Sequence, residues 1–201
     1  LDVSTASSTL FRLDSGADFD GTGMDMKVSG LQAVGVLGSG TGSVLNTRDA
    51  SIAVSGAGAQ GVIAEGGAMA TIDAATTMTL TGNGAVAGIA DGQKHSLTGA
   101  NTGSMVRSTS LTSLATLASS QAGVIGYIAR NGASLANSGD IDFTGAGTTG
   151  FIVETNASAS NGAKVDLSGP GATGALLRSG GTFANNGTIH VGNGTGVRVE
   201  G

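Results

Sequence analysis

The chain has 201 residues, of which 37 are Gly, 1 is Pro, 5 are Phe, 1 is Tyr and none is Trp or Cys. Apolar residues make up 39% of the sequence and charged residues only 11%, which excludes the charge-rich, apolar-poor composition of disordered chains. The net charge of −5 and the absence of a Lys/Arg run argue against nucleic acid and anionic membrane surfaces as partners.

No apolar run approaches the roughly 18 residues that a membrane-spanning helix needs. No charged segment followed by an apolar stretch opens the chain, so a signal peptide is not predicted. We therefore expect a mature or excised fragment of a longer protein. Without Cys there is no disulfide scaffold.

Residues 1–25 are the least regular part of the sequence. They begin with a Ser/Thr-rich stretch, STASST, and contain the acidic residues Asp14, Asp18, Asp20 and Asp25. We expect an irregular first coil or a cap here, because the terminal repeats of solenoid proteins are atypical.

The run from Asp18 to Asp25, DFDGTGMD, is similar to a calcium-binding loop. Its spacing does not fit the twelve-residue loop, because Gly16 stands where the first Asp ligand belongs and Lys27 where the closing Glu belongs. Asp18, Asp20 and Asp25 are therefore weak metal candidates. We predict no metal site and no cofactor.

From residue 26 onward one pattern recurs. Its best copy is Leu135 to Val153, in which Ile141 and Phe143 alternate with polar residues as in a half-buried strand. A glycine-rich turn follows, and a second short apolar strand ends the copy. Similar segments occur at residues 52–64, 165–177 and 189–199. Residues 26–201 are therefore predicted to form one continuous repeat domain.

The inward residue before each turn marks one expected coil. The eight expected inward residues are Val28, Val54, Leu80, Leu97, Leu117, Phe143, Leu167 and Val191. Each coil is expected to contain three short strands, and stacking at about 4.8 Å pairs every strand with the neighbouring coils. This predicts an all-β parallel β-helix, or β-solenoid, of about eight coils. The segment from Ser104 to Gln121 breaks the pattern and receives no assignment.

Asparagines recur near the corners of the expected coils, at Asn46, Asn137, Asn161 and Asn186. Stacked Asn side chains form hydrogen-bonded ladders in repeated β structures. Isolated left-handed turn positions are the alternative.

The motif Gly-x-Gly-x-x-Gly occurs three times, beginning at Gly56, Gly145 and Gly169. A single copy is typical of dinucleotide-binding turns. Here the motif repeats with the coils and runs into only three or four apolar residues, so no helix follows to face a phosphate. We assign these glycines to turns.

No catalytic residue is predicted. Asp140 and Asp142 lie on one side of a strand and have the spacing of an acid–base pair or a Ca²⁺-binding pair. A solvated outer face of the strand explains them better. His190 points outward between Ile189 and Val191, and Asp14-Ser15-Gly16 lacks the preceding glycine of a serine-protease motif. No G-x-S-x-G elbow is present. The outward row Thr77, Thr79 and Thr81 is not repeated on other coils as an ice-binding array would be.

The combination of φ-x-Asn-x-Gly-x-Ile-x-φ, a glycine-rich corner and a second apolar strand resembles autotransporter passenger domains. Residues 135–153 and 183–199 carry the resemblance best, and weaker copies extend over 26–201. The resemblance implies a right-handed parallel β-helix on the bacterial surface or released from it, exported through the periplasm and outer membrane. It also implies a C-terminal translocator barrel outside this chain.

From this resemblance we expect a non-enzymatic adhesin or aggregation factor with a role in virulence. Its partners are expected to be a host surface protein, a glycan or a neighbouring rod. The alternatives are a polysaccharide-active enzyme on a β-helix, which needs an acidic groove with a basic residue nearby, and a purely structural stalk.

Overall fold

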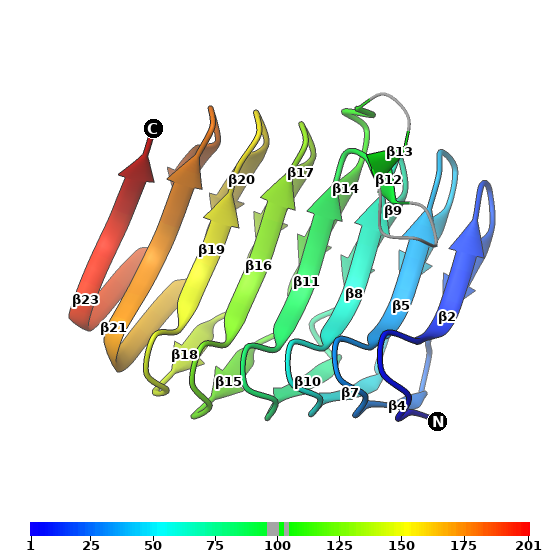
Figure 1. Ribbon diagram of the computed structural model, residues 1–201, viewed down its shortest axis with the longest axis horizontal. Helices are drawn as coiled ribbons and strands as arrows, with labels where there is room; N and C mark the ends of the chain where they lie inside the picture. The colour runs from blue at the N-terminus through cyan, green and yellow to red at the C-terminus, as the bar shows by residue number, and fades with distance from the viewer. Residues whose placement is uncertain (96–100, 103–104) are drawn as a thin grey trace.

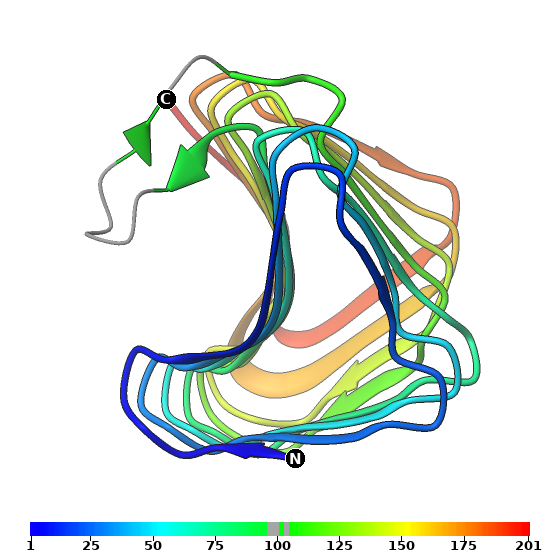
Figure 2. The same cartoon turned by 90° about the vertical axis from the view of Figure 1, so that its right-hand side faces the viewer.

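The computed structural model of the protein describes residues 1–95, 101–102 and 105–201. Every regular element in these residues is a β-strand, and the strands stack in parallel to form a β-solenoid of about eight coils (Figure 1). Seen from the N-terminal end, the chain turns clockwise as it recedes, so the solenoid is right-handed (Figure 2). None of the described residues belongs to a helix long and apolar enough to cross a membrane. The predicted all-β parallel β-helix is confirmed.

Each coil contributes a strand to three faces, because two turns and one looser corner separate three extended stretches. Face 1 comprises β1 (Asp2–Val3), β4 (Asp25–Val28), β7 (Ser51–Val54), β10 (Thr77–Leu80), β15 (Leu117–Ser119), β18 (Ile141–Phe143) and the first parts of β21 (Lys164–Arg178) and β23 (Thr188–Glu200). Face 2 comprises β2 (Thr9–Asp14), β5 (Val34–Ser39), β8 (Gln60–Glu65), β11 (Val86–Asp91), β16 (Ile125–Arg130), β19 (Thr149–Val153) and the second parts of β21 and β23. Face 3 comprises β3 (Asp18–Asp20), β6 (Val44–Asn46), β9 (Met69–Ile72), β14 (Ser110–Ser113), β17 (Ser134–Asn137), β20 (Ser158–Asn161) and β22 (Thr182–Asn185).

The register of face 1 fixes which residues stack. The inward column contains Val3, Val28, Val54, Leu80, Ser119, Phe143, Leu167 and Val191. Residues 1–25, expected to be an irregular coil or cap, supply β1, β2 and β3, which pair in parallel with β4, β5 and β6. The first coil therefore follows the same path as the second.

The expected column was wrong at Leu117. Leu117 pairs with Met78 and Ile141, so Ser119 takes the place opposite Leu80 and Phe143. The half-buried Ser119 hydroxyl is satisfied because it donates to the Leu80 carbonyl at 2.6 Å. The expected column residue Leu97 lies outside the described residues.

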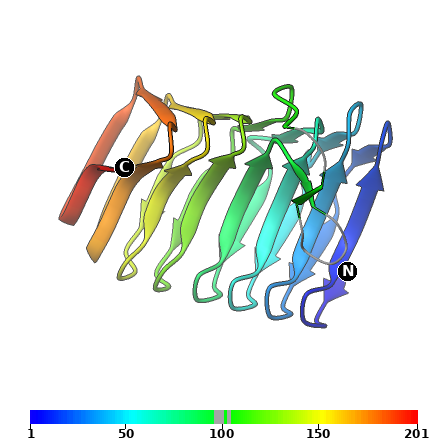
Figure 3. The same cartoon turned by 45° about the horizontal axis from the view of Figure 1, so that its top comes forward.

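The break in the repeat is an insertion between β11 and β14. Because β10 pairs directly with β15, the chain from Leu80 to Ser119 is one coil of 39 residues, whereas later coils need 24. The short antiparallel hairpin β12 (Lys94–His95) and β13 (Asn101–Thr102) belongs to this insertion. It projects from the corner between faces 2 and 3 (Figures 1 and 3).

The core is narrow and built from small aliphatic side chains, with its few aromatics stacked along the axis. The Tyr127 and Phe151 ring centroids are 6.0 Å apart, and those of Phe151 and Phe183 are 5.1 Å apart. Gly88 makes room for this cluster, since a Cβ there would lie 2.9 Å from Cδ1 of Leu111. Burial raises the pKa of the Tyr127 hydroxyl above its usual range, so this group stays a neutral hydrogen-bonding partner of Ser113.

Asparagines do form a ladder, and it contains two of the four predicted members, Asn137 and Asn161, together with Asn185. The Asn137 amide donates to Asn161 and the Asn161 amide to Asn185, each at 2.9 Å. The prediction that Asn186 belongs to the ladder was wrong, because Asn186 lies one residue after the inward position and is exposed. Asn46 was also wrong, because it stacks in an outward column with Thr71. The Oδ1 atom of Asn137 has no partner within the described part of the chain, because the preceding residue in the column, Ser113, bonds to Tyr127.

Each of the three positions in the Gly-x-Gly-x-x-Gly motif requires glycine for a different steric reason. A Cβ on the first glycine, Gly145, would lie 1.9 Å from the carbonyl oxygen of Gln121 on the preceding coil. The second, Gly147, has φ of +64°, which favours glycine. A Cβ on the third, Gly150, would lie 2.6 Å from the carbonyl oxygen of Gly174 on the next coil. Turn geometry and coil stacking thus account for the whole motif.

Replacing Gly150 by Ala should lower the free energy of unfolding by about 1–3 kcal/mol, because the added methyl group forces two coils apart. The control is Gly196→Ala, since a Cβ at Gly196 meets nothing within 4 Å. Urea denaturation followed by circular dichroism measures both. A Gly150→Ala variant as stable as the Gly196→Ala variant would contradict the stacking explanation.

Candidate functional site

A shallow trough runs along the outer side of face 3 over four successive coils. Its volume is about 410 Å³. The residues that line it are Ser110, Leu111, Thr112, Ser134, Leu135, Ala136, Ser158, Ala159, Ser160, Thr182, Phe183 and Ala184. None of them is charged, and the outward members are small. Because Leu111, Leu135 and Ala159 point into the core, the trough offers a surface of small outward side chains, most of which carry hydroxyl groups.

The hydroxyls form a row because β14, β17, β20 and β22 pair in register. Ser110, Ser134, Ser158 and Thr182 occupy the same position on successive coils. Ser134 and Thr182 donate only long hydrogen bonds of 3.5 Å to main-chain carbonyls, which are weak at that distance. These hydroxyls retain both donor and acceptor capacity for a ligand.

A second polar region lies on the outer side of face 1. There Asp166 accepts from Lys164 Nζ at 2.9 Å and contacts His190 Nδ1 at 3.0 Å. The hydrogen bond with His190 is the largest cause that lowers the pKa of Asp166, and the hydrogen bond with Lys164 is the next. The bond to Asp166 in turn raises the pKa of Lys164. Asp142 stacks beside Asp166 and lines a neighbouring hollow of about 340 Å³.

As the sequence predicted, Asp142 and His190 lie on the exposed side of face 1, as does Asp140. The structure brings Asp140 to the backbone N–H of Lys164, which donates to it at 3.0 Å. Sequence analysis did not anticipate the contact between Asp166 and His190, since 24 residues separate them. Aligning the coils by their Gly-rich turns would have placed the two side by side.

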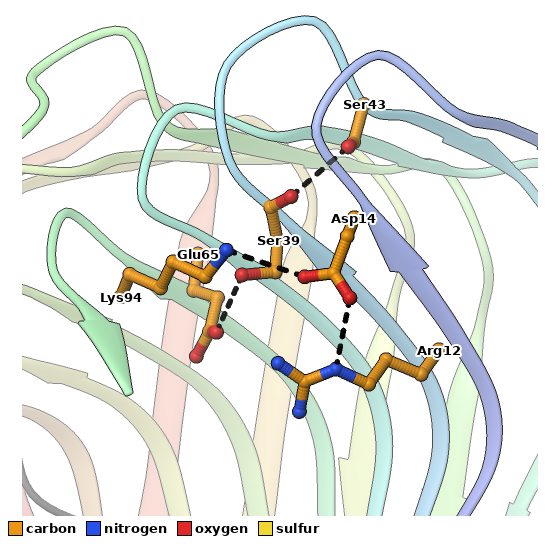
Figure 4. Close-up of polar contacts among 6 residues, drawn as sticks. All are labelled: Arg12, Asp14, Ser39, Ser43, Glu65 and Lys94. Atoms are coloured by element: carbon orange, nitrogen blue, oxygen red, sulfur yellow. Dashed lines mark hydrogen bonds and ion pairs between the residues drawn. The ribbon is translucent and has the colours of Figure 1, made fainter. Parts of the chain in front are cut away.

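The densest charged cluster lies where face 2 ends and the insertion begins (Figure 4). Asp14 accepts from Arg12 Nε and from Lys94 Nζ, each at 3.2 Å. Ser39 donates to Oε1 of Glu65 at 2.8 Å, and Glu65 is only 2% exposed. Lys94 belongs to the insertion and Asp14 to the first coil, so this contact connects chain segments 80 residues apart.

Asp91 closes the same cluster from the next coil. It is fully buried and accepts from Arg130 Nε at 2.6 Å and from the Asn131 amide at 2.7 Å. A third bond comes from the backbone N–H of Gln93. Buried carboxylates are stable only when charged partners and donors satisfy them, so Asp91 anchors the point where the insertion leaves the coil.

The glycine pair Gly66-Gly67 makes the insertion possible. A Cβ on Gly66 would lie 2.9 Å from Cβ of Lys94, and one on Gly67 would lie 3.1 Å from Cγ1 of Val106. Both glycines have positive φ. The two ends of the insertion thus pack directly on the turn of the preceding coil, and this cluster serves to hold the insertion in place.

The weak metal candidates do not converge. Asp18 and Asp20 are exposed on β3, whereas Asp25 begins β4 on face 1. Asp20 instead accepts from the backbone and side chain of Thr22 and lies 3.5 Å from Arg48. Across residues 1–95, 101–102 and 105–201 there is no group of three His, Cys, Asp or Glu residues suited to a metal ion.

No protein-family model, curated protein or solved structure matches the chain. The assignment of the fold therefore rests on the strand register, and the chemistry of each site is inferred from the residues that form it.

Removing Arg12 should raise the pKa of Asp14 toward 3.8 more than removing Lys94 does. The Arg12 hydrogen bond is the largest cause that lowers this pKa, ahead of the Lys94 hydrogen bond. Because the folded-state pKa is lowered, the stabilising effect of Asp14 is present above its unfolded pKa and is lost as pH falls through the folded value.

NMR titration of the Asp14 carboxyl group in Arg12→Gln and Lys94→Gln variants measures the two shifts. Lys27→Gln is the control, since Lys27 pairs with Asp2 on face 1. A larger rise in Lys94→Gln than in Arg12→Gln would show that the insertion, not β2, sets this pKa.

Proposed function

We propose that this chain is a non-enzymatic passenger segment of the autotransporter type, displayed on or released from a bacterial surface. In this proposal its rod binds an extended, uncharged glycan along the trough of face 3 and so acts in adhesion or cell aggregation. The observation that carries the proposal is the uncharged row of hydroxyls repeated over four coils.

The trough chemistry favours a glycan over a charged polymer. A sugar chain presents hydroxyl groups on its edges and apolar C–H faces, which match outward hydroxyls interspersed with the small apolar side chains of Ala136 and Ala184. An anionic ligand would need cations, and no Lys or Arg lines the trough. A ligand lying along the rod axis would meet an equivalent hydroxyl about every 4.8 Å.

The energetics suit an adhesive role. A single hydrogen bond contributes only about 0.5–1.5 kcal/mol net, so one coil binds weakly. Four coils acting on one polymer raise the effective concentration of each further contact. Many rods on one cell extend the same argument to whole-cell attachment.

Filling the trough should weaken binding strongly without disturbing the core. In the double variant Ser134→Tyr, Ser158→Tyr, the exposed side chains would occupy the space of two sugars, and we expect more than about tenfold weaker attachment. The assay displays the segment on a non-aggregating bacterium and measures binding to a panel of neutral glycans and matrix proteins. Thr77→Tyr is the control, because Thr77 is equally exposed but lies on face 1.

Two results would overturn the glycan proposal. One is undiminished binding by the double variant. The other is no binding by the unaltered, folded segment to any glycan, which would favour a structural stalk whose function lies elsewhere in a longer protein.

The second candidate function is cleavage of a polysaccharide on face 1. The observation favouring it is the hollow lined by Asp142 beside the Lys164–Asp166–His190 cluster. Paired carboxylates with different protonation are the machinery of glycoside hydrolysis, and the lowered pKa of Asp166 keeps that carboxylate ionised.

If face 1 is catalytic, the protein should release new reducing or unsaturated ends from a polysaccharide panel, and Asp142→Asn should reduce the rate by at least about a hundredfold. Asp18→Asn, on face 3, is the control for a generic loss of charge. Intact polysaccharides after prolonged incubation would exclude this candidate and leave the binding role.

A further inference from the structure

The far edge of face 2 carries alternating charges on four successive coils. Arg130, Glu154, Arg178 and Glu200 form this column, which we call the edge column. Reading toward the C-terminus, the signs are plus, minus, plus, minus. When this series is set against the same series in reverse order, every charge lies opposite a charge of the other sign.

A row of branched aliphatic side chains runs beside the edge column on the outer side of the same face. Ile128, Ile152 and Leu176 stack in register, and all three are only half-buried. They alternate with the core residues Ala129 and Val153, so they point away from the core. The row ends at Leu176, because Arg198 follows it in register on the last coil. Its three members thus offer a short, partly accessible apolar strip for a partner.

The insertion leaves this part of face 2 open. Lys94 reaches toward the first coil, where it contacts Asp14, and the hairpin lies on the N-terminal side of the fourth coil (Figures 1 and 3). The edge column begins on the coil after it, at Arg130.

We propose that the outer side of face 2 over the last four coils docks against the same surface of a second copy, with the two rods antiparallel. In this arrangement Glu154 of each copy faces Arg178 of the other, and Arg130 faces Glu200. Ile152 then meets Leu176, and Ile128 meets the aliphatic part of Arg198, which follows Leu176 in register. The contact is isologous, as in most two-fold dimers, and it goes beyond glycan binding because it uses a different face.

Charge complementarity selects the antiparallel arrangement. Both copies have the same spacing between coils, so the two columns align one to one along their length. Parallel alignment in register would place Arg against Arg and Glu against Glu, which is unfavourable. The antiparallel alignment places opposite charges at all four positions.

One member of the edge column, Glu154, keeps its charge free for a partner, since Arg130 is paired with Asp91 and Arg178 with Glu200 within the chain. Glu154 makes no ion pair within the described part of the chain, although arginines precede and follow it in the column. The Arg178 side chain is 44% exposed while bonded to Glu200. A second copy would give Glu154 the cation that its own coil lacks.

Two single charge reversals and their mixture test the proposal. Sedimentation equilibrium should show that the unaltered protein self-associates and that added salt weakens this association. Glu154→Arg and Arg178→Glu should each self-associate at least about tenfold more weakly, because each places like charges together twice. An equimolar mixture of the two variants should associate again, since every facing pair is then opposite. Asp18→Arg, on face 3, is the control with the same change of charge as Glu154→Arg.

A second pair of variants tests the geometry without altering charge. The chain has no Cys, so Ile152→Cys and Leu176→Cys each introduce a single thiol. On oxidation a mixture of the two should give a cross-linked heterodimer in larger yield than either variant alone. Monomeric unaltered protein at high concentration, failure of the mixture to associate, or equal cross-linking of each variant with itself would overturn the antiparallel dimer.

Discussion

The close approach of successive coils is the constraint on which this structure depends. Every strand pairs with the strand above and below at the spacing of a β-sheet, so the backbone of one coil lies against the backbone of the next. At Gly145, Gly150 and Gly169 a single added carbon would meet a neighbouring carbonyl oxygen within 2.6 Å. The glycines at these positions follow from this contact distance, because a larger residue there would push two coils apart.

Stacking also converts each sequence position into a column with one chemistry. Inside the rod this produces the aliphatic column, the aromatic cluster and the Asn ladder, in which Asn161 both accepts and donates. Outside it produces the hydroxyl row of face 3 and the edge column of face 2. A linear array of identical weak groups binds a polymer or another array better than it binds a compact molecule. The architecture therefore favours extended partners over small substrates.

The sequence predicted the repeat, the fold class and most of the inward column, because period-2 alternation and glycine turns are local signals. Its errors arose where the register depends on distant residues. Leu117 was assigned to the inward column by its hydrophobicity, yet Ser119 occupies that place through a bond to the Leu80 carbonyl. The prediction of Asn186 in place of Asn185 was an error of one residue in register, and a shift of one residue reverses the side-chain direction. The edge column and the cluster around Asp91 were missed, since their members come together only once the coils are aligned.

The insertion divides face 2 into two regions with different consequences. On the N-terminal side, Asp14 binds Lys94 of the insertion, and Asp91 accepts from the backbone of Gln93 and from Arg130. These carboxylates are thereby committed to the chain itself. On the C-terminal side Glu154 makes no ion pair within the described residues and lies next to the half-buried aliphatic row. A carboxylate without an ionic partner beside apolar side chains is unfavourable for an isolated rod, and the proposed second copy would supply the missing cation. The position of one hairpin thus decides which half of the face is internal scaffold and which half is left for recognition.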